Sequence, residues 1–320
     1  MSGRTSSRSG LVARPYTADD REAWDELAAA ARARHFMFQR GYMDYHADRF
    51  TDASLIVLRG GRPCALFPAT RHGETIISHG GLTFGGLLSG PEQTLGRTLS
   101  AFDALTEVLR EAGATRLVLK PLPHIYHVGA AEEDLYALHA AGATLAHRDV
   151  SAALSPTVRP RPAGARRRAA EHGRGTGMVL DEDDDIEAFM ELVASVLRER
   201  HDTTPTHTPE EMRRLADGFP ADIRLFTART NGELLAGTLV FQTPVVAHTQ
   251  YIAAAPRGRE LSATDALLSY VIEQRYPDRW FDFGTSNERD GSLNEGLARY
   301  KEAFGARAVM FDRYELELGS

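Results

Sequence analysis

The two halves of this sequence show the same order of predicted elements. Each half reads as a strand, two helices, three strands, a helix, a strand, a helix and a last strand, with a glycine turn between its second and third strands. In the second half this turn is Asn231-Gly232, a strong signal for a hairpin. Agreement across ten elements constrains a fold more than any single motif does. The sequence therefore predicts an α/β fold of α+β type, with mixed sheets, built from two modules in tandem.

Hydrophobic periodicity, caps and turn residues place these elements along the chain. We expect an N-terminal module at 11–154, a basic Pro/Arg/Gly-rich linker at 155–176 that passes into a short basic helix, and a C-terminal module at 177–320. The last strand of the first module is expected at 144–154, and that of the second at 307–318.

Composition narrows the class of protein. The net charge of −7 argues against a general nucleic-acid coat protein. The single cysteine, Cys64, excludes an intramolecular disulfide framework and fits a reducing compartment. The first ten residues are polar, and no apolar run reaches membrane-spanning length. We expect a cytoplasmic protein that is not inserted in a membrane.

The stretch 280–306 has the pattern of an active site. A short strand delivers Asp282, a polar loop follows, and a helix is expected to begin at Ser292, capped together with Glu295. Gly305 stands where a left-handed helix end belongs. The face expected to pack inward consists of Leu293, Leu297, Tyr300 and Phe304.

Lys301 is unusual, because only Lys120 and Lys301 are lysines among 37 basic residues. A lysine amine is a compact charge that can lose its proton, whereas an arginine is neither. Lys301 is therefore a candidate anchor for a phosphate or carboxylate. A role as general base requires a strongly lowered pKa.

Amide formation from an activated ester or thioester needs a neutral amine, a proton acceptor and a donor to the oxyanion. In the strand 245–254, alternation puts His248 and Gln250 on one face, and Thr249 and Tyr251 on the other. His248 is the candidate proton acceptor, and Tyr251 or Gln250 the oxyanion donor. Asp282 is expected to bind a substrate ammonium or to pair with Lys301. The competing interpretation is that these polar groups satisfy their neighbours or face solvent.

Further substrate contacts are expected at the end of the strand that carries Asp282, where ligands meet parallel sheets. The competing interpretation there is turn chemistry. His201 and His207 join two helices and are expected to line the acceptor side. Their spacing matches no usual zinc pattern, so no metal is predicted. The loop candidates are Gly284, Ser286, Asn287 and Glu288.

Three motifs carry a resemblance to a known family. They are F-D-F-G-T-S…L-N-E-G-L…K-E-A-F-G at 281–305, H-T-Q-Y-I at 248–252 and H-G-G-L-T-F-G-G at 79–86. Together with the element order, they resemble the FemAB-like branch of the Gcn5-related acyltransferase (GNAT) superfamily, the BioF2-like acetyltransferase domain, over about residues 11–318. The resemblance implies tandem GNAT modules with acyl transfer in the second, and relatives of this kind take aminoacyl-tRNA or acyl-CoA as donor.

One departure from the family bears on the donor. Enzymes of this superfamily that use CoA hold its pyrophosphate in a Q/R-x-x-G-x-G/A turn, but this chain reads R-G-R-E-L-S-A from Arg257, with Glu260 and Ser262 in the glycine places. This departure favours aminoacyl-tRNA slightly over acyl-CoA. Candidate donor contacts are Arg257, Arg259, Arg166 and Arg167.

The sequence thus predicts an N-acyltransferase that transfers an acyl or aminoacyl group directly to the amine of a small acceptor, with no tightly bound cofactor. The donor, the acceptor, tRNA as a partner and the oligomeric state stay open. The alternatives are a non-catalytic binding protein on a decayed acyltransferase scaffold, which would lack a polar floor, and an N-acyltransferase for amino sugars or cell wall.

Overall fold

The structure is a computed structural model, which describes residues 10–319. By internal contacts the chain divides into two units, one of residues 10–149 with 310–319 and the other of residues 150–309. The chain enters the second unit within β9 (Thr144–Leu154) and leaves it within β15 (Arg307–Glu317).

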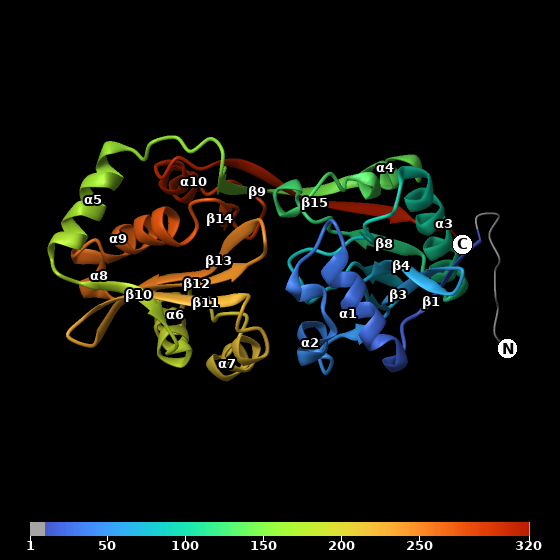
Figure 1. Cartoon of the computed structure of the whole chain (residues 1–320), viewed down its shortest axis with the longest axis horizontal. Coiled ribbons are helices and arrows are strands. Elements are labelled where there is room, and N and C mark those ends of the chain that lie inside the picture. Colours follow the sequence, from blue (N-terminus) through green and yellow to red (C-terminus); the bar gives the residue numbers. More distant parts are fainter. Residues whose placement is uncertain (1–9, 320) are drawn as a thin grey trace. The chain divides into compact units, whose positions relative to one another are not determined.

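The first unit combines two sets of strands with helices packed against them (Figure 1). One antiparallel sheet has the order β1-β3-β4-β7, and the other strands follow the order β15-β8-β6-β5-β2, in which only β6 and β8 are parallel. Helix α3 supplies Phe102 and Leu105 to a core that it shares with Phe67 and Leu117. The elements are β1 (Leu11–Pro15), α1 (Arg21–Ala30), α2 (Arg40–Met43), β2 (Thr51–Asp52), β3 (Leu55–Arg59), β4 (Arg62–Phe67), β5 (Thr70–His72), β6 (Thr75–Ile77), β7 (Leu88–Ser89), α3 (Leu95–Glu111), β8 (Arg116–Leu119) and α4 (Glu133–Ala140).

The second unit is a six-stranded sheet of order β10-β11-β12-β13-β14-β9, in which only β13 and β14 run parallel. Helices α6 and α7 lie on one face, and α9 and α10 on the other (Figure 1). The elements are α5 (Gly164–Gly175), β10 (Val179–Asp183), α6 (Ile186–His201), α7 (Pro209–Gly218), β11 (Ile223–Thr230), β12 (Glu233–Gln242), β13 (Val246–Ala254), α8 (Pro256–Glu260), α9 (Ala263–Tyr270) with a π-turn at Val271–Arg275, β14 (Trp280–Thr285) and α10 (Glu295–Glu302).

The predicted tandem fold is confirmed, and the first unit adds the short strands β2, β5 and β7 to the expected order. The hairpin turn at Asn231-Gly232 has φ of 51° and 84°, which this dipeptide tolerates at low cost. The sequence T-P-E-E from Thr208 predicts a capping box with Glu211, and this box opens α7. Hydrophobic periodicity predicts one helix at 39–50, but this segment is broken into short pieces, of which α2 is one.

The last strand of each module pairs outside its own half of the sequence. Strand β9 pairs with β14 through Leu154 and Ala153, and β15 pairs with β8. By their contacts, residues 310–319 therefore belong to the first unit, whereas the sequence assigned them to the C-terminal module. Alternation in a strand reveals which face is buried but does not specify the partner strand.

The segment 155–176 contains a packed helix in addition to extended chain. Helix α5 buries Ala170 and places Gly173 against α9, where an added Cβ would lie 2.8 Å from the Ala266 Cβ. Arg159 is drawn inward too, since its guanidinium donates to the carbonyls of Ile272 (2.9 Å) and Tyr276 (2.7 Å) at the end of the π-turn. Much of this segment is therefore anchored to the second unit.

The expected start of the helix after the polar loop is wrong by three residues. Helix α10 begins at Glu295, and its cap is Asn294, whose side chain accepts from the Leu297 amide at 2.8 Å. Ser292 instead bonds Asp290 in the loop. The inward face is also shorter than expected, because Phe304 is buried but Leu293 and Leu297 are exposed. Gly305 has a φ of 96°, as predicted for the helix end.

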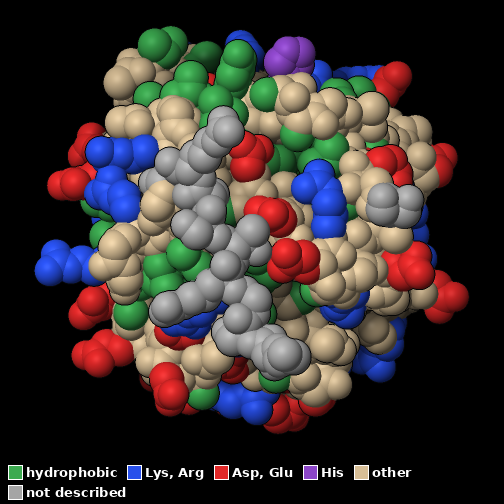
Figure 2. Space-filling model, turned by 90° about the vertical axis from the view of Figure 1, so that its right-hand side faces the viewer, with side chains coloured by type: hydrophobic (Ala, Val, Ile, Leu, Met, Phe, Trp, Pro, Cys, Tyr) green, Lys and Arg blue, Asp and Glu red, His purple; other side chains and the backbone are tan. Residues whose placement is uncertain are grey.

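The face in Figure 2 carries basic and acidic side chains interspersed with one another, with no broad patch of one sign. Within residues 10–319, no helix has the length and apolar character needed to cross a membrane.

Candidate active site

The two parallel strands of the second unit separate after three paired residues. Strands β13 and β14 pair at Val246 with Trp280, Ala247 with Phe281 and His248 with Asp282, and beyond that point they share no further pairs. Both strands nevertheless continue, β13 to Ala254 and β14 to Thr285. The pair His248–Asp282 thus stands at a fork, beyond which the two strands no longer pair with each other.

A β-bulge in β13 changes which candidates share a face. Tyr251 pairs with Leu239 and Thr249 with Val240, so Gln250 is an extra residue without a partner on β12. His248 pairs with Phe241, which lies on the same side of β12 as Leu239. The bulge therefore puts Tyr251 on the face of His248, and the prediction of opposite faces is wrong. Bulges cannot be read from alternation, because they interrupt it.

Asp282 is completely buried and holds the His248 ring in place. Its Oδ2 lies 3.0 Å from Nδ1 of His248, and its Oδ1 accepts from the Ser151 hydroxyl at 2.5 Å and from the Gly284 amide at 2.9 Å. A carboxylate only accepts hydrogen bonds, so Nδ1 of His248 carries the proton and Nε2 has the lone pair. The expected pairing of Asp282 with Lys301 is replaced by this contact.

Ser151 was missed by the sequence reasoning. It lies on β9, which the sequence assigns to the first module, and reaches Asp282 only because β9 pairs with β14. No motif surrounds it, so only the pairing of β9 identifies it.

Lys301 holds the end of β14 from α10. Its Nζ donates to the carbonyls of Gly284 (2.7 Å) and Thr285 (2.6 Å). Burial lowers the pKa of Lys301 to about 8, while the charge of Asp282 acts in the opposite direction. Gly284 has a φ of 78°, and a Cβ there would lie 3.3 Å from Cε1 of His248. Lys301 therefore fixes the backbone on which the His248 ring rests.

The loop after β14 is shaped mainly by its own side chains. The Asn287 side chain accepts from the Val150 amide of β9 (2.8 Å) and donates to the Gly291 carbonyl in the loop (2.9 Å), so its donor and acceptor are both used. Glu288 accepts from Asn294 at 2.6 Å and lines an open hollow with Thr203, Arg289 and Asp290. The Ser286 hydroxyl differs, because it is buried and has no partner among the described residues.

His207, on the loop between α6 and α7, meets Tyr251 of β13. The Tyr251 hydroxyl lies 2.8 Å from Nδ1 of His207, which is buried, and burial raises the pKa of Tyr251. The side chain of His201 lies outside what the structure describes. Among the described residues, no three His, Cys, Asp or Glu side chains gather as a metal site would require.

Three of the four donor-binding candidates have partners within the second unit. Arg166 donates to Asp265 at 2.6 Å and lies over the Tyr300 ring, Arg257 pairs with Glu233, and Arg259 donates to the Ala254 carbonyl at 2.7 Å. Arg167 is half-buried.

Part of the backbone where a pyrophosphate turn is expected is helical. It forms the short helix α8, in which the amides of Arg259 and Leu261 bond the carbonyls of Ala255 and Arg257. Gly258 is packed so tightly that an added Cβ would lie 1.9 Å from the Leu235 carbonyl oxygen. Amides that are used inside a helix are not available to a phosphate.

Comparison with known proteins agrees with this fold. Residues 158–302 match the family described as an acetyltransferase (GNAT) domain, and no curated protein matches the chain by sequence. The structure of FemX is similar with a TM-score of 0.69 at 11% identity, covering 95% of this chain and 97% of that chain.

Two further structures are similar over nearly the whole chain. The C-terminal domain (DUF2156) of a proposed lysylphosphatidylglycerol synthetase from Agrobacterium fabrum gives a TM-score of 0.61 at 15% identity, covering 93% of this chain and 91% of that one. A tandem GNAT protein from the clavulanic acid biosynthesis pathway gives 0.50 at 16%, covering 97% and 98%.

Residues 158–302 therefore contain a GNAT acetyltransferase domain, and the protein is an acyltransferase. The structures of FemX and of the lysylphosphatidylglycerol synthetase domain share the tandem fold of this chain, as the resemblance in the sequence implies. GNAT domains use acyl-CoA as a co-substrate and have no tightly bound cofactor.

Proposed function

We propose that the protein transfers an aminoacyl group from aminoacyl-tRNA directly to the amine of a small acceptor, at the fork between β13 and β14. The observation that carries the proposal is the imidazole of His248 held by a buried Asp282 where the two strands separate. This polar floor is what a decayed, non-catalytic scaffold would lack.

His248 is the proposed proton acceptor. With Nδ1 bonded to Asp282, Nε2 can take the proton of the acceptor amine as its nitrogen attacks the carbonyl carbon of the donor ester. The tetrahedral intermediate then collapses, the ester C–O bond breaks, and the tRNA hydroxyl leaves with a proton. No covalent enzyme intermediate is needed.

Two hydroxyls are the proposed oxyanion donors. Tyr251 lies on the His248 face of β13 and is oriented by His207, while the buried Ser286 hydroxyl follows directly after β14. A buried hydroxyl without an acceptor costs about 1–3 kcal/mol, which a developing oxyanion would recover.

Lys301 acts here as a positioning residue. Its ammonium already donates to two carbonyls of β14, so it shapes the floor under His248. This role replaces the direct phosphate or carboxylate anchor that the sequence suggested.

The choice of donor rests on two features. Helix α8 fills the turn that would hold the pyrophosphate of CoA, and Gly173 of α5 packs against the Ser262 carbonyl just before α9. In addition, Arg161, Arg168 and Arg174 on or beside α5 are exposed and form no ion pair among the described residues. Exposed arginines suit the phosphates of a nucleic acid.

The name of the lysylphosphatidylglycerol synthetase domain, which shares the fold, is consistent with transfer of an aminoacyl group. The acceptor is expected at the hollow lined by Glu288 and Asp290, where carboxylates favour an amine.

The test compares donors under single-turnover conditions. Labelled aminoacyl-tRNAs and labelled acetyl-CoA are each mixed with excess enzyme and a panel of small amines. We expect acyl transfer from tRNA, weakened at least tenfold in the double variant Arg168→Ala/Arg174→Ala and unchanged in the matched variant Arg200→Ala at the end of α6. Transfer from acetyl-CoA with micromolar binding, and none from tRNA, would overturn the choice of donor.

A further inference from the structure

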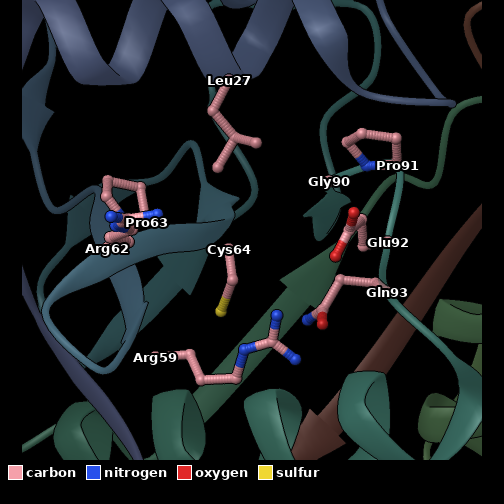
Figure 3. A pocket seen from close by; sticks show the side chains of 9 residues that line it. All are labelled: Leu27, Arg59, Arg62, Pro63, Cys64, Gly90, Pro91, Glu92 and Gln93. Carbon is pink, nitrogen blue, oxygen red and sulfur yellow. The ribbon is translucent and has the colours of Figure 1, made fainter.

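A second pocket lies in the first unit, apart from the acyl-transfer residues. It has a volume of about 330 Å³ and is formed by the hairpin of β3 and β4, by α1 and by the turn that precedes α3 (Figure 3). Gly90 is needed in its wall, because an added Cβ would lie 3.0 Å from Leu27 Cδ1 and 3.1 Å from the Cys64 carbonyl oxygen. The lining residues are Leu27, Arg59, Arg62, Pro63, Cys64, Gly90, Pro91, Glu92 and Gln93.

Gln93 is the group that most clearly needs a ligand. Its side chain is 6% exposed, and its Nε2 has no hydrogen-bond partner among the described residues. The backbone of Gln93 is fixed, since its amide donates to the Gly90 carbonyl at 3.0 Å and its carbonyl accepts from Arg32 at 3.2 Å. An unpaired buried amide is costly, so the pocket gains from an acceptor placed at this nitrogen.

Arg59 supplies a positive charge at the same end. In Figure 3 its guanidinium extends below Cys64 toward Gln93. Neither Arg59 nor Arg62 forms an ion pair with any residue in the described part of the chain. The first turn of α3, which begins just beyond Gln93, has no acidic residue and no side-chain cap, so its positive end is not neutralised locally. This end of the pocket therefore favours an oxyanion.

Glu92 provides the opposite charge. Its carboxylate projects into the pocket near Gly90 and Pro91, on a different side from Arg59 (Figure 3), and within residues 10–319 it pairs with no base. A pocket of this size with an unpaired guanidinium, an unpaired carboxylate and a buried amide donor matches a ligand that itself carries both charges. Leu27 and Pro63 add apolar wall for a small side chain.

We propose that this pocket binds a free α-amino acid or a close zwitterionic relative. Its carboxylate bonds Arg59 and Nε2 of Gln93, and its ammonium bonds Glu92. The site is separate from the acyl-transfer residues, and the inference does not depend on the proposed function.

The single cysteine of the chain makes the test independent of activity. Cys64 lines the pocket, so the rate of its alkylation by iodoacetamide reports whether the pocket is occupied. The full-length protein is treated with iodoacetamide in the presence of each L-amino acid in turn. Each amino acid that slows alkylation is then compared with its N-acetyl form, with its amide and with inorganic phosphate. We expect one or a few free amino acids to slow alkylation at least fivefold, and both blocked forms and phosphate to have no effect.

Variants separate binding from loss of fold. Arg59→Gln and Glu92→Gln should each weaken protection at least tenfold, whereas Arg49→Gln, outside the pocket, should leave it unchanged. Cys64→Ser should bind the same amino acid in calorimetry, which excludes an effect on the thiol alone. Protection by none of the amino acids, equal protection by a blocked form or by phosphate, or full protection in Glu92→Gln would overturn the proposal.

Discussion

His248 and Asp282 are opposite residues on parallel strands, and Nδ1 of the histidine lies 3.0 Å from a carboxylate that is fully buried. A charge in such a place is retained only when it is well paired. The pairing fixes both the tautomer and the direction of the ring. His248 can thus present Nε2 to a substrate at the point where the strands separate.

We predict that His248→Ala lowers kcat for acyl transfer by about 10²–10⁴-fold, because a positioned proton acceptor contributes that much. KM should change little. The measurement is single-turnover kinetics with the preferred donor, and the exposed His172→Ala is the matched control. A variant that keeps more than a tenth of the wild-type rate would remove His248 from this role.

Asp282→Asn tests the positioning of the ring. An amide can no longer accept from His248, Ser151 and Gly284 together, so we expect the free energy of unfolding to fall by about 1–3 kcal/mol and kcat to fall nearly as far as in His248→Ala. The double variant should be no slower than His248→Ala alone, since the two residues act as a unit. Additive losses in kcat would contradict this coupling.

Much of the fold followed from the sequence because it depends on local signals. Asn231-Gly232 and the Thr208 cap act within a few residues, and both are confirmed. Periodicity was less reliable, because the helix at 39–50 is broken and Leu293 and Leu297 are exposed. The partner of a last strand is a long-range property, which is why the contribution of Ser151 was missed.

The sequence predicted which residues form the site better than it predicted how they are arranged. The motif at 281–305 singled out Asp282 and Lys301, but one extra residue at Gln250 turned Tyr251 to the other face. Arg166 and Arg259 were chosen as donor contacts because of their charge. In the structure they bond a carboxylate and a carbonyl of the protein, and charge alone does not reveal such partners.

Lys301→Met tests whether the lysine ammonium is needed to hold the end of β14. Two carbonyls lose their donor, so we expect kcat to fall about tenfold or more while Lys301→Arg recovers little, because a guanidinium is too large for the site. The pH dependence is also diagnostic. The pKa of Lys301 is about 8 when folded and about 10.5 when unfolded, so the folded state disfavours the charge and the wild type gains stability as the pH rises from 8 to 10.5.

In denaturant titrations, the difference in unfolding free energy between wild type and Lys301→Met should grow by about 1.4 kcal/mol per pH unit in that window. Lys120 has a similarly lowered pKa but is present in both proteins, so its effect cancels. A constant difference between pH 8 and 10.5 would contradict the buried charge.

Acid should destabilise the first unit through two stacked histidines. Burial lowers the pKa of His46 and lowers that of His79 to about 3, and the two rings lie 5.3 Å apart. The unfolded chain therefore binds protons more readily, so stability is complete above about pH 6.5 and is lost as the pH falls toward 3. His79→Asn keeps a residue that tolerates the local φ of 54° and should reduce the slope of stability against pH between 6 and 4. Equal slopes in thermal melts of the two proteins would count against this interpretation.

Two glycines on α5 test whether this helix is held against α9. A Cβ on Gly173 would lie 2.8 Å from the Ala266 Cβ and 2.9 Å from the Ser262 carbonyl oxygen, while one on Gly175 would meet nothing within 4 Å. Alanine is the better helix former at both places, by about 1 kcal/mol. Gly173→Ala should nevertheless lower the free energy of unfolding by about 1–3 kcal/mol, because overpacking outweighs that gain, and Gly175→Ala should be neutral or slightly stabilising. Hydrogen exchange in α5 should accelerate in the first variant only. If both variants melt alike, α5 is not packed on α9, and its part in excluding a pyrophosphate from the start of α9 has to be abandoned.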